Sequence, residues 1–170
     1  MYFPQLAWTV AAAAARPRLQ LLDESVLALR VWPDDLDLNL HMNNARYLTA
    51  MELGRWDLAI RQGWMPKVWK RRWQILIGSA TVRYKRGLKP FEKYALHTRL
   101  AGWNEKWCFI EHTLKRSNGD VAAQGAVKGI FRGREGNVPT PEVMQTLGFE
   151  AEVAPDPPEW IAQWHATEGR

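Results

Sequence analysis

The sequence predicts an α+β fold in which one curved antiparallel sheet of five or six strands wraps around one long central helix, with short terminal helices. Three observations lead to this prediction. A buried strand and a long apolar helix come early in the chain, four strand-like runs follow without a helix between them, and tight turns join those runs. Consecutive strands without intervening helices pair antiparallel, and a helix that is apolar on most sides has to be enclosed.

The length of 170 residues suits one domain with decorated ends. We divide the chain into an apolar extension over residues 1–20, a core domain over residues 21–135 and a helical tail over residues 136–170. Residues 1–15 are rich in alanine and lack the positive start of a signal peptide. We expect them to form a helix that docks on the domain, and peripheral contact with a membrane surface is the alternative.

The first strand is expected over residues 25–32, where one face is wholly apolar and Arg30 is the only charge on the other. That pattern predicts a strand buried largely on both sides. Pro33 ends the strand because it cannot donate to a sheet, and residues 34–43 are expected to form an ordered loop.

The long helix is expected over residues 44–62, with Asn43 or Asn44 as its N-cap and Gly63 just past its end. Apolar residues cover most of its circumference, and only narrow polar stripes remain. Such a helix is stable only with other structure around it.

The four later strands are expected at residues 73–85, 93–103, 106–116 and 121–132. The segment 117–120 contains the Asn-Gly pair favoured in hairpin turns, and 102–105 is a second hairpin candidate. A sheet of this kind has open edges, which favours a homodimer or a dimer of dimers.

Composition narrows the classes of partner. The formal net charge of +5 favours anionic partners, but no basic stripe or zinc spacing indicates nucleic acid. Cys108 is the single cysteine, so no intrachain disulfide forms, and no apolar run is long enough to span a membrane. We therefore expect a cytoplasmic protein. Ten tryptophans, several within residues 64–73, would fill the core, face a partner subunit or line an apolar cleft.

Five polar side chains are concentrated just before the long helix: Asp37, Asn39, His41, Asn43 and Asn44. The first N–H groups of a helix have no internal partners and lie at its positive end, where they can stabilise a developing oxyanion. A carboxylate or imidazole beside them can activate water. Because capping needs only one or two polar residues, the group of five indicates a site for acyl chemistry.

The run D-L-N-L-H-M-N-N-A-R-Y-L-T-A-M-E-L-G-R, residues 37–55, resembles the active-site segment of hotdog-fold thioesterases. Its D-x-N-x-H-x-N-N core is similar to that of plant-type acyl-carrier-protein thioesterases, and its wider spacing is similar to that of the 4-hydroxybenzoyl-CoA thioesterase-like group. The resemblance implies a hotdog fold and hydrolysis of an acyl-CoA or acyl-carrier-protein thioester. Coenzyme A or phosphopantetheine would enter only as part of the substrate, without another cofactor.

The resemblance also implies roles for single residues. Asp37 matches the catalytic carboxylate, as base or nucleophile, while Asn39 and His41 match polar residues credited with catalysis in the carrier-protein branch. The backbone from Met42 to Asn44 matches the turn that stabilises the oxyanion. Either Asp37 or His41 could be the base. No metal site is expected, because His41 has no Cys or carboxylate partners at zinc-ligand spacing.

The candidate contacts to substrate are Tyr47, Glu52, Arg83, Lys85 and Arg86. Tyr47 would line the acyl cleft or pack in the core, and Glu52 would stand at a dimer interface. The three cations would meet the phosphates at the mouth of the cleft.

Two alternatives to a thioesterase stay open. Hotdog hydratases and dehydratases resemble G-D-x-N-P-x-H, whereas here His41 follows Asp37 by four residues and no Pro follows Asn39. A non-catalytic acyl-ligand-binding or scaffold protein is compatible with the apolar N-terminus and the tryptophans.

The carrier-protein branch also takes a further acidic residue from a second repeat of the fold, which a second subunit would have to supply here.

Overall fold

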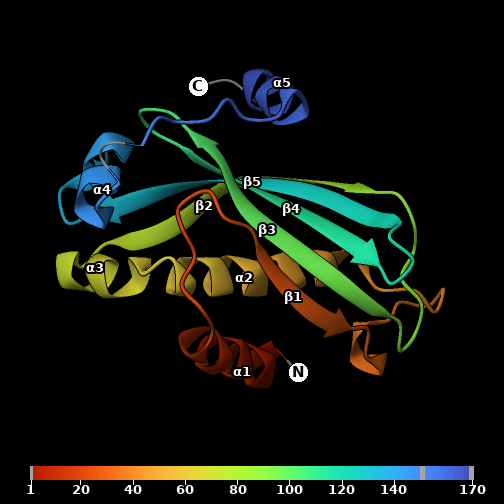
Figure 1. Cartoon of the computed structure of the whole chain (residues 1–170). Coiled ribbons are helices and arrows are strands. Elements are labelled where there is room, and N and C mark those ends of the chain that lie inside the picture. The colour runs from red at the N-terminus through yellow and green to blue at the C-terminus, as the bar shows by residue number, and fades with distance from the viewer. Residues whose placement is uncertain (1, 150–151, 169–170) are drawn as a thin grey trace.

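The computed structural model in Figure 1 describes residues 2–149 and 152–168. Met1, residues 150–151 and residues 169–170, which belong to the predicted extension and tail, lie outside the described residues. The elements are α1 (Tyr2–Ala15), β1 (Ser25–Arg30), η1 (Pro33–Asp35), α2 (Asn44–Arg61), α3 (Trp64–Arg71), β2 (Gln74–Tyr84), β3 (Lys93–Trp103), β4 (Cys108–Arg116), β5 (Val121–Gly133), β6 (Gly136–Val138), α4 (Thr140–Leu147) and α5 (Glu159–Thr167).

One curved antiparallel sheet forms the body of the molecule, in the order β1-β3-β4-β5-β2, and the short β6 pairs with the end of β5. The sheet curls over α2, while α5 lies on its opposite face and α4 at one end (Figure 1). The predicted α+β architecture, with a sheet wrapped around a long central helix, is therefore confirmed.

Helix α2 packs against the concave face of the sheet, and nearly every side of it is buried. The side chain of Asn43 accepts a hydrogen bond from the Ala45 N–H at 2.9 Å, which makes Asn43 the N-cap. Gly63 follows the helix at φ 76°, the left-handed conformation expected of a residue past the C-terminus. In the middle of the helix, a Cβ on Gly54 would lie 2.2 Å from Oγ1 of Thr98, so only glycine allows this approach.

Three elements are absent from the sequence prediction, and the first is the single turn η1 at the start of the expected loop. Helix α3 follows Gly63 directly, and Pro66 is tolerated there because it lies in the first turn. Its Trp64, Met65 and Val68 are buried against the core, so packing stabilises a helix of only eight residues. Strand β6 lies at the start of the segment expected to be a helical tail, where a three-residue strand carries no sequence signal of its own.

Helix α1 packs on the side of α2 that faces away from the sheet (Figure 1). Thr9 and Ala13 form its buried side. None of the helices in residues 2–149 and 152–168 combines the length and apolarity needed to cross a membrane.

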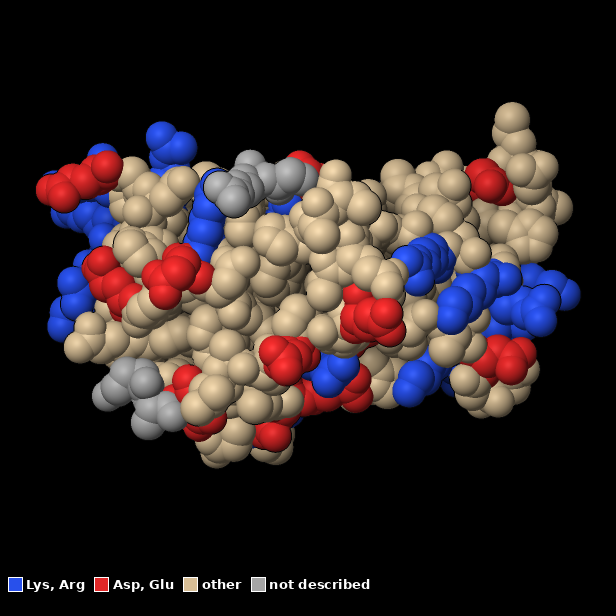
Figure 2. Space-filling view, turned by 90° about the horizontal axis from the view of Figure 1, so that it is seen from above, with Lys and Arg blue, Asp and Glu red and all other residues tan. Residues whose placement is uncertain are grey.

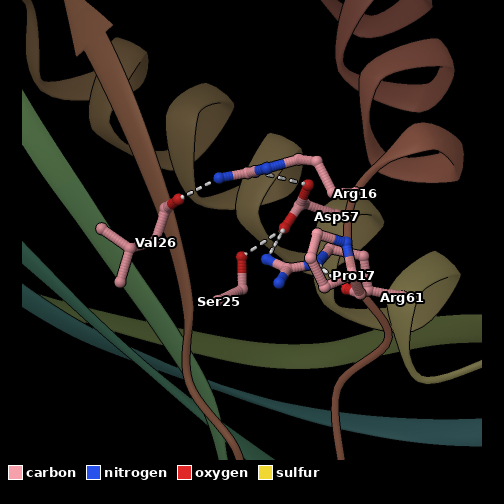
Figure 3. A network of polar contacts seen from close by, with 6 residues as sticks. All are labelled: Arg16, Pro17, Ser25, Val26, Asp57 and Arg61. Carbon is pink, nitrogen blue, oxygen red and sulfur yellow. Dashed lines mark hydrogen bonds and ion pairs between the residues drawn. The ribbon is translucent and has the colours of Figure 1, made fainter.

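A buried carboxylate fastens the segment after α1 to α2 and β1 (Figure 3). Asp57, on α2, is fully buried. It accepts hydrogen bonds from Arg16 at 3.0 Å, from Ser25 Oγ at 2.6 Å and from Arg61 at 3.2 Å. Arg16 also donates to the carbonyl of Val26 at 2.9 Å. The carboxylate is thus paired with two guanidinium groups, as a buried charge requires.

The substitution Asp57→Asn should lower the free energy of unfolding by about 3 kcal/mol or more, because it leaves Arg61 buried without its counter-charge. Urea unfolding followed by circular dichroism measures this change. The matched control is Glu135→Gln on an exposed turn, which should alter stability by less than about 0.5 kcal/mol. Equal stability of the two variants would show that the network is not essential.

Candidate functional site

Residues 37–44, which lead into α2 and are called the polar loop below, are organised around the carboxylate of Asp37. Its Oδ1 accepts hydrogen bonds from the backbone N–H groups of Asn39 at 2.8 Å and of His41 at 3.2 Å. Within the described residues no donor reaches Oδ2, so one oxygen holds the loop and the other is left to act on a ligand. Asp37 and Asn39 line an open hollow of the surface, and Leu40 adopts a positive φ of 55° in the same turn.

The helix start offers fewer N–H groups than the motif implies. The Met42 N–H donates to the carbonyl of Leu88 at 2.9 Å, and the Asn43 N–H donates to the carbonyl of Asp35 at 2.8 Å. Both groups are therefore engaged in the fold. The Asn44 N–H has no acceptor among the described residues, and it lies at the positive end of the α2 dipole. Of the three predicted oxyanion positions, Asn44 alone has an N–H left for a ligand.

The loop that follows β2 closes over His41. A Cβ on Gly87 would lie 2.6 Å from Cδ2 of His41, so the imidazole packs on the backbone of Gly87. The ring of His41 is exposed and has no hydrogen-bond partner in the part of the chain that the structure describes. Lys85 and Arg86 come immediately before Gly87 and are exposed. The structure therefore brings these two predicted cations next to the polar loop.

The two tyrosines beside the helix start have different surroundings. Tyr47 is buried, and its hydroxyl accepts a hydrogen bond from the Leu88 N–H at 3.4 Å. Burial raises the pKa of its phenol. Tyr84, at the end of β2, stacks edge-on against Tyr47 and donates to the carbonyl of Asn44 at 3.2 Å. Within this chain Tyr47 is therefore a core residue, and Tyr84 is the tyrosine near the open helix start.

Arg83 lies apart from the other predicted cations. Its guanidinium stacks over the ring of Trp160 on α5, with 5.1 Å between the Cζ atom and the ring centroid. It thus faces the convex side of the sheet, opposite to Tyr84. Figure 2 shows Lys and Arg side chains gathered at the right-hand end of the molecule, where Figure 1 places the loops after β2 and β4.

Glu52 lies at a second site, farther along α2. With Arg55 it lines an apolar cavity of about 300 Å³ between α2, α3 and the first half of β2. The aromatic residues lining this cavity are Trp56, Trp64, Trp69, Trp73 and Phe131. The first lining residue of α2 comes eight residues after Asn44, about 12 Å along the helix axis. In one protomer, therefore, the cavity and the polar loop do not form a single cleft.

The described residues contain no group of three or more His, Cys, Asp or Glu side chains placed to hold a metal. Cys108 is buried, and burial raises the pKa of its thiol to about 12. A thiol that stays protonated is a poor nucleophile. Cys108 is therefore not a candidate nucleophile.

A family model described as the thioesterase-like superfamily matches residues 31–165. The chain belongs to this superfamily. Protein THEM6 of Xenopus laevis is 29% identical over 167 residues, which cover 96% of this chain and 78% of that protein. The probable thioesterase YbaW of Escherichia coli superposes with a TM-score of 0.68 at 18% identity, over 75% of this chain and 98% of that one. The DHNA-CoA thioesterase of Staphylococcus aureus has a TM-score of 0.67 at 15% identity, over 86% and 95%.

These similarities confirm the hotdog fold and the resemblance to hotdog thioesterases. Within this thioesterase-like domain, sequence reasoning missed Tyr84 and Gly87, and it gave the cavity beside α3 only as one of three alternatives for the tryptophans. Tyr84 and Gly87 are far from the motif in sequence, and only tertiary contacts with Asn44 and His41 bring them to it. The run of tryptophans from Trp64 to Trp73 was the one available signal for the cavity.

The hotdog domain also buries one histidine that the polar loop does not use. His112 on β4 is fully buried, with Nδ1 3.0 Å from Oγ1 of Thr98. Its Nε2 has no partner within the described residues. Burial, and then the positive charge of Arg55, hold its pKa well below the ordinary value of 6.5. The folded protein therefore keeps this imidazole neutral.

Stability should fall as the pH drops below about 6.5, because the unfolded chain binds a proton on His112 that the folded chain refuses. The contribution grows by up to about 1.4 kcal/mol for each pH unit below that value. Urea unfolding of wild type and His112→Gln between about pH 7 and pH 5 isolates it. The wild type should lose more stability than the variant, and parallel curves would contradict the assignment.

Proposed function

We propose that this protein hydrolyses an acyl-CoA or acyl-carrier-protein thioester with a water molecule activated by Asp37. The observation that carries the proposal is that two groups of the polar loop and helix start remain available to a ligand. A carboxylate with one uncommitted oxygen stands just before an uncommitted N–H group at the positive end of α2. Membership of the thioesterase-like superfamily supports the reaction type.

In the proposed reaction the thioester carbonyl oxygen accepts the Asn44 N–H, which polarises the carbonyl carbon. Oδ2 of Asp37 takes a proton from water as the water oxygen bonds to that carbon. The tetrahedral intermediate then collapses, the carbon–sulfur bond breaks, and the proton returns to the departing sulfur. The products are a carboxylic acid and a thiol. His41 is the rival base, since it belongs to the same loop and its imidazole is exposed.

The basic end of the molecule suits the phosphates of coenzyme A or of a phosphopantetheine arm. Lys85 and Arg86 lie beside His41 on the neighbouring loop, and both are exposed. Cations there would pair with phosphate oxygens while the thioester reaches the helix start. A substrate with this anionic group would also be attracted by the net charge of +5.

We further propose that a second copy of the chain completes the site. Strand β2 is an open edge, and its Ile75, Leu76 and Ile77 are 37%, 37% and 41% exposed. An apolar edge of this length favours pairing with another strand. The polar loop also exposes Leu38 and Leu40, which a partner or an acyl chain would cover.

Pairing of β2 with its own copy would join the two halves of the site. One end of β2 lines the apolar cavity through Ile75 and Ile77, and the other end reaches Asn44 through Tyr84. Antiparallel pairing about a two-fold axis places the first end of one strand beside the last end of the other. The cavity of one subunit then lies near the polar loop of its partner, where it can hold the acyl group.

The substitution Asp37→Asn should lower kcat by about a hundredfold or more for the best substrate in a panel of acyl-CoAs. The Asn side-chain oxygen can still accept the N–H groups of Asn39 and His41, so the loop keeps its shape while the base is lost. Released thiol, measured with a thiol reagent, gives the rate.

The matched control is Asp34→Asn, which removes an exposed carboxylate three residues earlier and should retain activity. If Asp37→Asn keeps most of its activity and His41→Ala does not, the base is His41. Hydration of an enoyl-CoA without release of thiol would contradict hydrolysis altogether.

A mixing experiment tests the shared site. Asp37→Asn disables the loop, and Ala59→Phe fills the cavity that Ala59 lines. Each variant alone should be inactive, provided that its melting temperature shows it folded. After mixing and subunit exchange, half of the dimers carry one intact site, so about a quarter of wild-type activity should return. No recovery, although exchange is demonstrated, would place the complete site within one chain.

A further inference from the structure

The outward face of α1 lacks the charged residues that an exposed helix normally carries. No residue from Tyr2 to Ala15 is charged. The exposed positions include Phe3 at 79% and Trp8 at 76%, with Val10 at 38% and several alanines. A helix on a globular domain normally turns charged and polar residues to water. This uncharged, largely apolar face is therefore suited to contact with another surface.

The charge on either side of α1 identifies the kind of cover. The larger cleft beside it, about 860 Å³, is lined by Gln5, Trp8 and Thr9 together with Arg30, Arg46, Lys93, Lys115 and Arg116. Among the residues that the structure describes, Asp35 is the one acidic residue lining that cleft. A second groove, about 290 Å³, runs between α1 and α3 and is lined by Arg16, Arg18 and Arg61. No acidic residue of the described part of the chain lines it.

Part of this positive charge is already paired within the fold, and part is available. Arg16 and Arg61 bind Asp57, Arg46 lies 3.6 Å from Asp35, and Arg116 pairs with Glu92 at 2.5 Å. By contrast, Arg18, Arg30 and Lys93 make no ion pair with any carboxylate of the described residues. Arg18 donates to the carbonyl of Ile60 at 3.1 Å, and the guanidinium of Arg30 lies 6.0 Å from the ring centroid of Trp32, but neither contact neutralises the charge. An apolar helix flanked by these cations is complementary to a surface with an apolar interior and an anionic outer layer.

We propose that α1 rests on an anionic lipid bilayer, with Phe3, Trp8 and Val10 at the boundary of the acyl chains. Aromatic side chains favour this interface, since the ring is apolar and the indole N–H can bond with headgroups. Arg18, Arg30 and Lys93 would pair with lipid phosphates and carboxylates beside the helix. The exposed Trp69 of α3 lines the groove next to α1 and extends the same apolar surface.

The position of α1 leaves it free for this contact in the proposed dimer. Helix α1 lies beyond α2 from the sheet (Figure 1), on the β1 side of the molecule, while the dimer would form through β2 at the opposite edge. A two-fold axis that pairs β2 antiparallel runs perpendicular to the sheet, so both copies of α1 face the same way. Two helices on one plane bind a membrane with avidity.

Co-sedimentation of the whole protein with vesicles tests the proposal. The vesicles contain phosphatidylcholine alone, or phosphatidylcholine with about one third phosphatidylserine. We expect binding to the anionic vesicles, weakened several-fold by high salt. The double variant Phe3→Ser, Trp8→Ser should bind about tenfold more weakly, and Arg18→Gln with Lys93→Gln should bind several-fold more weakly. The control Val153→Ser alters an equally exposed apolar residue far from α1 and should bind as the wild type does.

Three results would overturn the proposal. Equal binding of the wild type and the Phe3→Ser, Trp8→Ser variant would remove α1 from the contact, and equal binding to both kinds of vesicle would remove the anionic surface. Failure to bind either kind, with assembly beyond the dimer that the double variant disperses, would show that copies of the chain cover α1. Because the substituted side chains are mostly exposed, unchanged melting temperatures will show that the variants are folded.

Discussion

The buried carboxylate of Asp57 is the interaction on which the arrangement of the N-terminal half depends. Its two oxygens accept hydrogen bonds from Arg16, Ser25 and Arg61, and thus join the segment after α1, the first residue of β1 and the body of α2. A charge buried in this way has to be compensated by fixed partners. Because β1 and α2 are held at this point, the loop between them is confined to the other end of α2, where the polar motif lies.

The groups that remain available to a ligand at that end of α2 depend on which ones the fold already engages. The Met42 and Asn43 N–H groups bond to carbonyls of neighbouring loops, and one oxygen of Asp37 holds the turn. What remains for a ligand is a small set: one carboxylate oxygen, the Asn44 N–H and an exposed imidazole. These groups are held in place, since Asp37, His41 and Asn44 each also make a hydrogen bond within the fold.

The two edges of the sheet, β1 and β2, have different surroundings. Strand β2 connects the helix start to the apolar cavity, so self-association through it would unite features that lie at opposite ends of one chain. The other edge, β1, lies on the side where α1 presents an uncharged surface between basic clefts. The domain can therefore assemble through one edge while it turns a different surface toward another partner.

The sequence by itself determined the fold class, the order of the strands along the chain, the limits of α2 and the place of the polar segment before it. These follow from local rules: apolar periodicity, the Asn43 cap, the Gly63 stop and five polar residues in one loop. Only the tertiary structure decided which groups remain available there, because hydrogen bonds to Leu88 and Asp35 and the contact with Gly87 join distant segments. It also placed Tyr47 in the core, one of its two predicted positions, and Arg83 against Trp160, since the neighbour that a side chain meets depends on how distant segments pack.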